Sequence, residues 1–251
     1  MQVFGTSDVG MRRSLNEDNF SVETFDDVVI ALVCDGMGGA SAGEVASRIA
    51  CRTFMTTLTP KIREIKENIA DKTELIIKVE RAIYNASEKA NEEVYSKANL
   101  DDSLSGMGTT LSGCIIIEDI LWTFNVGDSR VYHITKDSAK QLTVDHSFVQ
   151  TLLDEGKITL AEAQNHPNKN VILRALGVTK NVECDVCNME VNKGYYLICS
   201  DGLSNYFDSD KFIKVLSSFK GLSEKAEDLV TYANSMGGSD NITVILIDTE
   251  K

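Results

Sequence analysis

The pattern of apolar and polar positions over the first hundred residues predicts three short strands and two long helices. Runs that alternate apolar with polar side chains, and that are rich in β-branched and aromatic residues, predict strands over 2–8, 19–25 and 28–35. From Ala42 the apolar residues recur every three or four positions, which predicts a helix that ends near Pro60. The same spacing predicts a second helix over about 73–98.

The remainder of the chain predicts further strands and a second pair of helices. Three β-rich runs with only short turns between them are expected to form an antiparallel meander over 108–118, 120–128 and 130–135. A more polar stretch with short helices follows, in which Thr159 and Glu162 have the spacing of a capping box. The last strands and helices are predicted over 182–191, 194–201, 209–218, 222–236 and 241–248. Because strands outnumber helices and the helices come in pairs, we expect an α+β fold of stacked sheets covered by helices.

The composition is that of a globular protein with an acidic surface. Of the 251 residues 43% are hydrophobic and 25% are charged, and since no repeat or linker divides them we expect one domain over 1–251. The 38 acidic and 25 basic residues give a formal charge of −13 without a basic stripe, which argues against nucleic acid and anionic membrane surfaces as partners. The acidic excess suits divalent cations, which prefer carboxylate ligands.

The sequence carries no pattern typical of secretion or membrane insertion. The N-terminal residues lack the basic start and apolar core of a signal peptide, and no run reaches the roughly 18 apolar residues of a membrane span. The six cysteines lie mostly within apolar stretches and are expected to be reduced core residues. We therefore expect a cytoplasmic protein without a membrane span.

Acidic residues recur at the ends of the predicted strands. Four apolar runs each begin or end beside an aspartate: Asp35, Asp128, Asp201 and Asp240. A single aspartate in such a place is most often a turn former or a helix cap. The four together, with the adjacent pair Glu17 and Asp18, predict a nest of carboxylates if the strand ends meet at one edge of a sheet.

Such a nest predicts a particular chemistry. Its mutual repulsion requires cations, and oxygen ligands without Cys or His favour Mg²⁺ or Mn²⁺ over zinc. Two such ions about 3.5–4 Å apart lower the pKa of a bridging water and clamp a phosphoryl oxygen for in-line attack. Arg13, five residues before Asp18, is placed to bind the other phosphate oxygens, whereas Arg12 is expected to be a surface cation. The residues alone thus predict metal-assisted phosphoryl hydrolysis.

Eight motifs occur in the order typical of a known family: SDVGMRRSLNED, VCDGMGG, SGMGTTL, NVGDSRVY, LTVDHS, NVILRALG, ICSDGL and GGSDNITVILI. Over about residues 5–247 the chain resembles the bacterial metal-dependent Ser/Thr protein phosphatases, the PPM or protein phosphatase 2C family. The resemblance implies a four-layer αββα sandwich, in which two antiparallel sheets are flanked by pairs of helices. It also implies a small flap over about 147–180 that borders the site and is associated with substrate choice.

The resemblance implies a role for each candidate metal ligand. Asp35 would bridge two metal ions, and the backbone carbonyl of Gly36 would bind one of them. Asp201 and Asp240 would complete the other site. The glycines after Asp35 would then let the backbone itself approach the cations.

Three further acidic residues and one arginine also match positions in the family. Glu17 and Asp18 match positions that hold the metals directly or through water. Asp128 matches a ligand of a third, weaker metal site, shared with Asp201. Arg13 matches the phosphate-binding arginine, so Arg13 and Asp35 are the expected catalytic residues.

Met37 departs from the pattern of some members, notably animal ones. Those members have a histidine directly after the Asp-Gly pair, proposed as the general acid for the leaving alkoxide. Met37 cannot donate a proton, so a metal-bound water or another group must do so. His146 is expected to position other groups rather than to act as the acid, and Arg174 is equally suited to a substrate contact or a structural ion pair.

The expected activity is hydrolysis of phosphoserine and phosphothreonine in proteins by a metal-activated bridging water at a binuclear Mn²⁺ or Mg²⁺ centre, without a covalent phosphoenzyme. Phosphorylated proteins, including a Ser/Thr kinase and its substrates, are the expected partners, and a monomer is the expected state. One alternative is a phosphatase of small phosphate esters. Another is a non-catalytic module that binds phosphoproteins, which the complete set of acidic residues disfavours.

Overall fold

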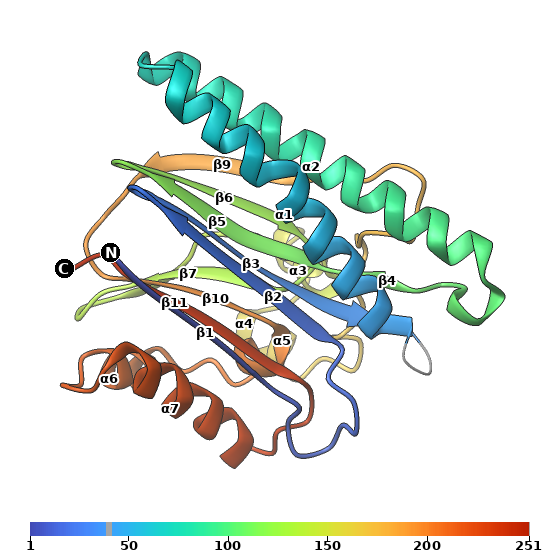
Figure 1. Ribbon diagram of the computed structural model, residues 1–251. Coiled ribbons are helices and arrows are strands. Elements are labelled where there is room, and N and C mark those ends of the chain that lie inside the picture. The colour runs from blue at the N-terminus through green and yellow to red at the C-terminus, as the bar shows by residue number, and fades with distance from the viewer. Residues whose placement is uncertain (39–41, 251) are drawn as a thin grey trace.

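Two antiparallel β-sheets stack face to face in the computed structural model, which describes residues 1–38 and 42–250 (Figure 1). One sheet contains, in order across it, β1 (Gln2–Asp8), β11 (Ile242–Asp248), β10 (Tyr195–Cys199), β7 (Arg130–Ile134) and β8 (Ala139–Gln141). The other contains β2 (Asp18–Phe25), β3 (Val28–Met37), β5 (Leu111–Ile117), β6 (Ile120–Val126) and β9 (Asp185–Glu190), with β4 (Gly108–Thr109) paired to the end of β3.

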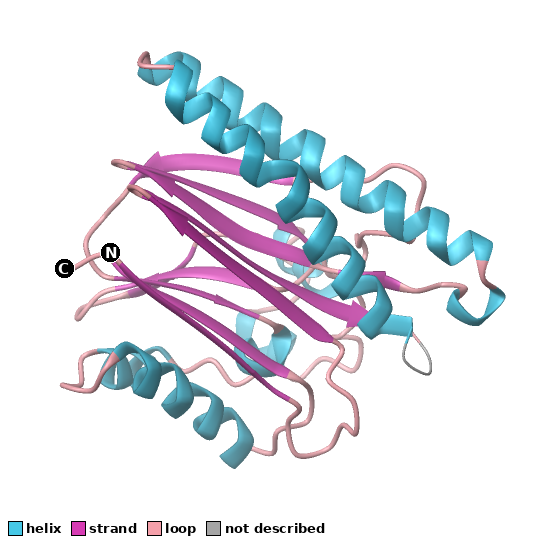
Figure 2. Ribbon diagram, viewed as in Figure 1, coloured by secondary structure: helices cyan, strands magenta, loops and turns pink. Residues whose placement is uncertain are grey.

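Helices cover the outer face of each sheet, as Figure 2 shows. The pair α1 (Ala42–Asn68) and α2 (Lys72–Leu100) packs on the sheet that contains β3, and the pair α6 (Ser209–Leu216) and α7 (Leu222–Ser235) packs on the other. The short helices are η1 (Asp102–Leu104), α3 (Phe148–Asp154), α4 (Leu160–Gln164) and α5 (Asp201–Ser204). None of the helices within 1–38 and 42–250 combines the length and apolar character that crossing a lipid bilayer requires. The order helices, sheet, sheet, helices confirms the predicted fold class.

Strand β3 shows why the core runs are apolar without interruption. Its even-numbered residues from Val28 to Cys34 face α1 and α2, whereas Val29, Ala31 and Val33 face the other sheet. A strand buried on both faces needs no polar alternation. The same alternation turns the side chain of Asp35 toward the space between the two sheets.

Helix α1 continues to Asn68, so the prediction that it ends near Pro60 is wrong. A proline inside a helix removes a backbone hydrogen bond and costs about 3 kcal/mol. Beyond it, however, Ile62 and Ile65 are buried in the core that α1 shares with α2. Burying two such side chains contributes about 1.5–3 kcal/mol each, which outweighs the effect of the proline.

The predicted three-stranded meander is wrong at its third member. Strands β5 and β6 pair as expected, but β6 then pairs with β9, and β7 joins the other sheet beside β10. The turn between β6 and β7 contains Gly127, whose φ of 110° lies in the left-handed region that glycine adopts without strain. This turn carries the chain from one sheet to the other, and Asp128 lies at the crossing.

Residues 147–180, the expected flap, contain α3 and α4. The predicted capping box of α4 is present, with the side chains of Thr159 and Glu162 each bonded to the backbone N–H of the other residue. Backbone hydrogen bonds in both directions between Thr109 and Leu176 join the end of this segment to β4.

Candidate metal centre

The predicted acidic residues come from elements of both sheets that meet at one edge. Asp18 is the first residue of β2 and the direct partner of Asp35 in β3, so their side chains lie on the same face of the sheet. Asp201 is the first residue of α5, just after β10, and Asp240 lies just before β11. Asp35 is therefore inside β3, which continues to Met37 and pairs there with β4, and Asp201 begins a helix, rather than each ending a strand as the sequence predicted.

Asp35, Asp201 and Asp240 line a pocket of 250 Å³. It is lined by Arg13, Glu17, Asp35, Gly36, Met37, Gly38, Asp128, Asn170, Ile172, Asp201 and Asp240. Asp18 is buried, with 6% of its surface exposed, beside Asp35. The structure therefore brings together all the site residues that the sequence predicted.

The backbone of Asp35 is held by the two threonines of the GTT motif. The N–H of Asp35 donates to Thr110 Oγ1 over 2.9 Å, and the Asp35 carbonyl accepts from Thr109 Oγ1 and from the Thr110 N–H, each over 2.9 Å. Thr110 Oγ1 is in turn 2.8 Å from Ser129 Oγ, next to Asp128. These contacts fix the relative positions of two of the predicted metal ligands.

Gly36 is a glycine because two backbone segments pass against it. A Cβ at this position would collide with the carbonyl of Gly43 in α1 and lie 2.6 Å from the carbonyl oxygen of Glu17. The backbone segments that approach Gly36 closely are therefore the protein's own, not a cation as the sequence suggested. Gly36 could bind a metal ion only through its carbonyl oxygen. Gly39, the last residue of the VCDGMGG motif, lies outside the described residues.

Glu17 lies against the first turn of α1. Its carboxylate contacts the backbone N–H groups of Gly43 and Glu44, where the helix dipole favours negative charge, although burial raises the pKa of Glu17. Its own backbone N–H donates to Asn241 Oδ1 over 2.8 Å, and its carbonyl accepts from Ser47 Oγ over 2.6 Å. Glu17 is thus positioned from both sheets and from α1.

Asp18 is anchored by two hydroxyls from the other sheet. Its Oδ2 accepts from Ser200 Oγ over 2.7 Å and from Thr243 Oγ1 over 2.6 Å. Ser200 directly follows β10, and Thr243 lies within β11. These two hydrogen bonds therefore link the two sheets through Asp18, next to Asp35.

Arg13 forms an ion pair with Asp240 at the mouth of the pocket. Its Nη2 lies 2.8 Å from Asp240 Oδ2, and 48% of the arginine side chain is exposed. The loop that carries it is docked on the turn before β11, because the Met11 N–H donates to the Gly238 carbonyl over 2.8 Å. Gly10, with a φ of 77°, allows this close approach.

His146 positions the turn that carries Asp128. Its Nδ1 accepts from the Gly127 N–H over 3.0 Å, and its Nε2 lies 3.2 Å from Asp185 Oδ2. Arg174 Nη1 lies 2.7 Å from Asp185 Oδ1, so Arg174 forms a structural ion pair here. Neither His146 nor Arg174 lines the pocket, which agrees with a positioning role for the histidine.

Burial and mutual repulsion raise the pKa values of the buried carboxyl groups. Burial is the main cause for Asp35, whose pKa is raised well above its usual range, and the charges of Asp18 and Asp201 add to it. Burial likewise raises the pKa of Asp18 to about 7. It raises the pKa of Asp201 to about 6, helped by the charge of Asp240, and raises that of Asp128, helped by Asp201. The protein alone does not compensate these charges.

The pocket fits a hard divalent cation. Asp18 Oδ1 and Asp128 Oδ1 are buried without a hydrogen-bond partner among the described residues, and a cation would satisfy such oxygens. Within 1–38 and 42–250, no three Asp, Glu, His or Cys side chains are already grouped to hold one ion. Carboxylate oxygens of this kind suit Mg²⁺ and Mn²⁺.

Sequence reasoning missed the residues that hold the ligands in place. Asn241 donates through Nδ2 to the carbonyls of Val9 and Leu15, which fixes the loop of Arg13. Its place directly after Asp240 in the motif GGSDNITVILI was the available signal. Asn170 and Ile172 reach the pocket from the flap, and although they belong to the motif NVILRALG, neither was singled out from the sequence.

Comparison with known proteins gives consistent matches over the whole chain. The model of the family described as Protein phosphatase 2C matches residues 10–234. The serine/threonine phosphatase stp of Listeria innocua is 40% identical over 246 residues, which cover 96% of this chain and 93% of that protein.

Solved structures agree with these sequence matches. The crystal structure of serine/threonine phosphatase Stp1 from Staphylococcus aureus has a TM-score of 0.88 and 31% identity, and the match covers 100% of this chain and 95% of that one. The catalytic domain of serine threonine protein phosphatase PstP, solved in complex with 2 manganese ions, has a TM-score of 0.78 and 32% identity over 98% of this chain and 97% of that one.

Proposed function

The chain belongs to the protein phosphatase 2C family, and on this premise we propose that it hydrolyses phosphoserine and phosphothreonine in proteins at a pair of Mn²⁺ or Mg²⁺ ions. Its activity is that of a metal-dependent protein-serine/threonine phosphatase. The observation that carries the proposal is the cluster of carboxylates beside the exposed guanidinium of Arg13, in which the buried Asp18 and Asp128 each have an unpaired oxygen.

The acidic residues divide the work of holding the metals. Asp35 would hold both ions, the Gly36 carbonyl would bind one of them, and Asp201 and Asp240 would complete the other site. Asp128 would hold a third, weaker ion with Asp201. When bound, the ions activate water and offset the charge of the phosphoryl oxygens.

Glu17 and Asp18 would hold the ions directly or through water. The bonds from Ser200 and Thr243 to Asp18 Oδ2 leave its buried Oδ1 without a partner, so Oδ1 would be free to bind an ion or a water that the ion holds. Glu17, held at the start of α1, adds a further negative charge to the site. Met37 lines the pocket but has no proton to donate, so the proton for the leaving alkoxide would come from a water held by the ions or from another group.

We further propose the setting in which this activity operates. The protein would act in the cytoplasm as a monomer and a single domain, with residues 147–180 as its flap. Its substrates would be phosphoproteins, among them a Ser/Thr kinase and the proteins that this kinase phosphorylates. Removal of these phosphate groups would reverse kinase signalling. The name of the Listeria relative, a serine/threonine phosphatase, supports this proposal.

The substrate class is tested by comparing phosphorylated peptides with small phosphate esters in Mn²⁺. We expect kcat/KM for phosphothreonine peptides to exceed that for free phosphoserine, phosphothreonine and sugar phosphates. Higher values for the small esters would indicate a metabolite phosphatase instead. Binding of phosphopeptides without any metal-dependent turnover would indicate a non-catalytic module.

Arg13→Ala is expected to lower kcat/KM for phosphopeptides by about 10–100-fold, because charge-assisted hydrogen bonds of about 1.5–3 kcal/mol to the phosphate are lost. Arg12→Ala is the matched control, since Arg12 is exposed and does not line the pocket. Steady-state kinetics of both variants measure the difference. Equal effects of the two substitutions would contradict the role given to Arg13.

A further inference from the structure

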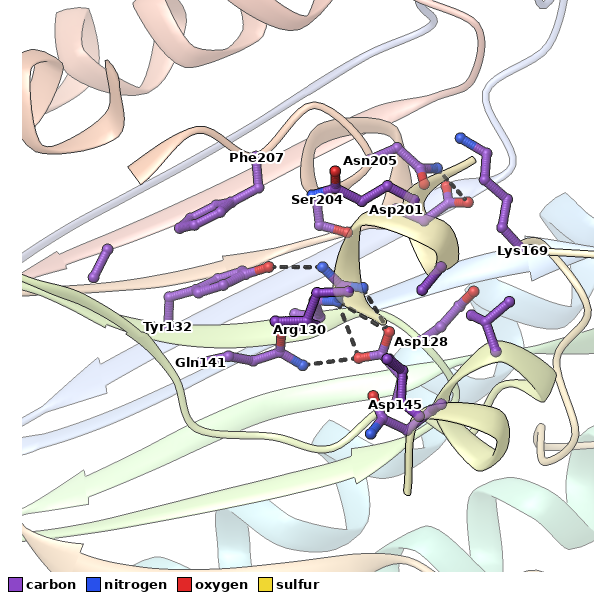
Figure 3. A pocket seen from close by; sticks show the side chains of 17 residues that line it. Asp128, Arg130, Tyr132, Gln141, Asp145, Lys169, Asp201, Ser204, Asn205 and Phe207 are labelled. Carbon is purple, nitrogen blue, oxygen red and sulfur yellow. Dashed lines mark hydrogen bonds and ion pairs between the residues drawn. The ribbon is translucent and has the colours of Figure 1, made fainter. Parts of the chain in front are cut away.

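A second cavity, of 370 Å³, adjoins the metal pocket. It lies between α3 and α4 on one side and β7, β8 and α5 on the other (Figure 3). Asp128 and Asp201 line both this cavity and the metal pocket. A peptide whose phosphorylated side chain is at the metal centre therefore has the cavity within reach of its neighbouring residues. We call this space the flap cavity.

Two opposite walls of the flap cavity are apolar. The side chains are Val149, Leu153, Leu160 and Ala163 from the flap and Ala139 and Phe207 from the body of the protein. Leu160 is 75% exposed, so much of its apolar surface lacks a covering partner. Phe207 stacks on Tyr132, with ring centroids 4.5 Å apart, which fixes the opposite wall. The walls thus offer apolar surface to an incoming group.

Two of the charged groups between these walls, Arg130 and Asp145, pair with each other. Arg130 Nε and Nη2 bind the carboxylate of Asp145 over 2.7–3.0 Å, and Arg130 Nη1 donates to the Tyr132 hydroxyl over 3.0 Å (Figure 3). Gln141 Nε2 also donates to Asp145, over 2.9 Å. A ligand therefore needs no charge of its own to satisfy Arg130 and Asp145, and it gains by burying apolar surface against the two walls.

We propose that the flap cavity receives an aliphatic or aromatic side chain of the phosphoprotein, within a few residues of the phosphorylated Ser or Thr. The inference rests on the proposed function, because the phosphate must occupy the neighbouring metal pocket. The volume lies in the range of about 300–1,000 Å³ typical of ligand pockets. An apolar anchor in such a pocket is a common source of specificity.

The proposal is tested with phosphothreonine peptides that differ only at one flanking position. Each of three positions on either side carries Leu, Phe, Gly or Asp in turn, and kcat/KM is measured with Mn²⁺. At one position we expect Leu or Phe to exceed Gly by about tenfold or more, through burial of one apolar side chain. The Asp peptide should be no better than the Gly peptide.

Two variants of the cavity should abolish this preference. Ala163→Phe fills the space, and Leu160→Asp places a charge in the exposed apolar wall without removing a buried side chain. In both, the ratio between the Leu and Gly peptides should fall to within about twofold, while p-nitrophenyl phosphate turnover stays near wild type. Leu173→Ala is the matched control, because Leu173 is an exposed apolar flap residue that lines neither pocket.

Several results would overturn the inference. These are equal rates for all flanking residues, a preference for Asp that points to Lys169 in the lining, or equal losses for peptides and p-nitrophenyl phosphate in Leu160→Asp. In each of these the phosphopeptides are still hydrolysed, so the proposed function stands. Turnover of p-nitrophenyl phosphate without turnover of any phosphopeptide contradicts the proposed function and this inference together.

Discussion

Asp35→Asn is expected to lower kcat for phosphopeptides by on the order of a thousandfold or more, while the protein stays folded. Asp35 interacts with four other acidic residues of the site, so it is the carboxylate best placed to be shared by two ions. Asparagine keeps the size of the side chain and removes the charge. The measurement is single-turnover hydrolysis at saturating Mn²⁺, which separates the chemical step from product release.

Two controls accompany this variant. Asp137→Asn removes an exposed aspartate outside the pocket and should leave the rate unchanged. Thermal unfolding without metal should show Asp35→Asn to be at least as stable as wild type, because the substitution removes one of the repelling charges. A rate within a few-fold of wild type would show that Asp35 does not hold the catalytic metals.

The metal-free protein is expected to lose stability as pH rises from 5 to 8, and saturating Mn²⁺ should restore it. Folding raises the pKa of Asp201 to about 6 and that of Asp18 to about 7, mainly by burial. A raised pKa means that the folded state binds the proton more tightly than the unfolded chain, whose aspartates titrate near pH 4. The resulting stabilisation is complete below that pH and is lost as pH rises through the folded values.

The expected size of this effect is a few kcal/mol, since one pKa unit corresponds to about 1.4 kcal/mol. For a chain of this length, that lowers Tm by roughly 5–10 °C between pH 5 and pH 8 in the presence of a chelator. Differential scanning fluorimetry with and without Mn²⁺ measures both curves. A metal-free Tm that is constant or rises over this range would show that folding does not raise the pKa values of these carboxyl groups.

The gathering of acidic side chains at one site could be predicted from the sequence, because each of them has a local signature. Asp35, Asp128, Asp201 and Asp240 stand beside apolar runs with glycine or serine next to them, and buried strands are recognisable from composition alone. Convergence of these residues was inferred from the carboxylates and from the order of eight motifs, and the structure places them around one pocket.

The path of the chain between these runs could not be predicted in the same way. The turn at Gly127 moves β7 to the second sheet, and the pairing with β10 that makes this favourable involves residues about 60 positions away. The continuation of α1 through Pro60 similarly depends on burial of Ile65 against a separate helix. The local sequence indicates a turn or a helix-breaking proline. It carries no information on the tertiary contacts that outweigh these preferences.

The supporting residues and the flap cavity were also beyond sequence reasoning. Ser200 and Thr243 are ordinary strand-end residues in the sequence, and only the stacking of the sheets brings them to Asp18. Leu160 reads as the first helix residue after the N-cap Thr159, and its exposure in the cavity wall opposite Phe207 appears only in three dimensions. Functional groups with titratable side chains leave a pattern in the sequence, whereas apolar surfaces that form a cavity do not.

The central claim is that the carboxylate pocket binds the metal ions that the phosphatase uses. It is tested most directly by titrating chelator-treated wild-type protein with Mn²⁺ and measuring bound ions and phosphopeptide hydrolysis in the same samples. We expect no hydrolysis before Mn²⁺ is added, recovery that follows the binding of about two ions per chain, and no recovery in Asp35→Asn. Hydrolysis that persists at full rate in excess chelator, or recovery of Asp35→Asn in step with wild type, would contradict the claim.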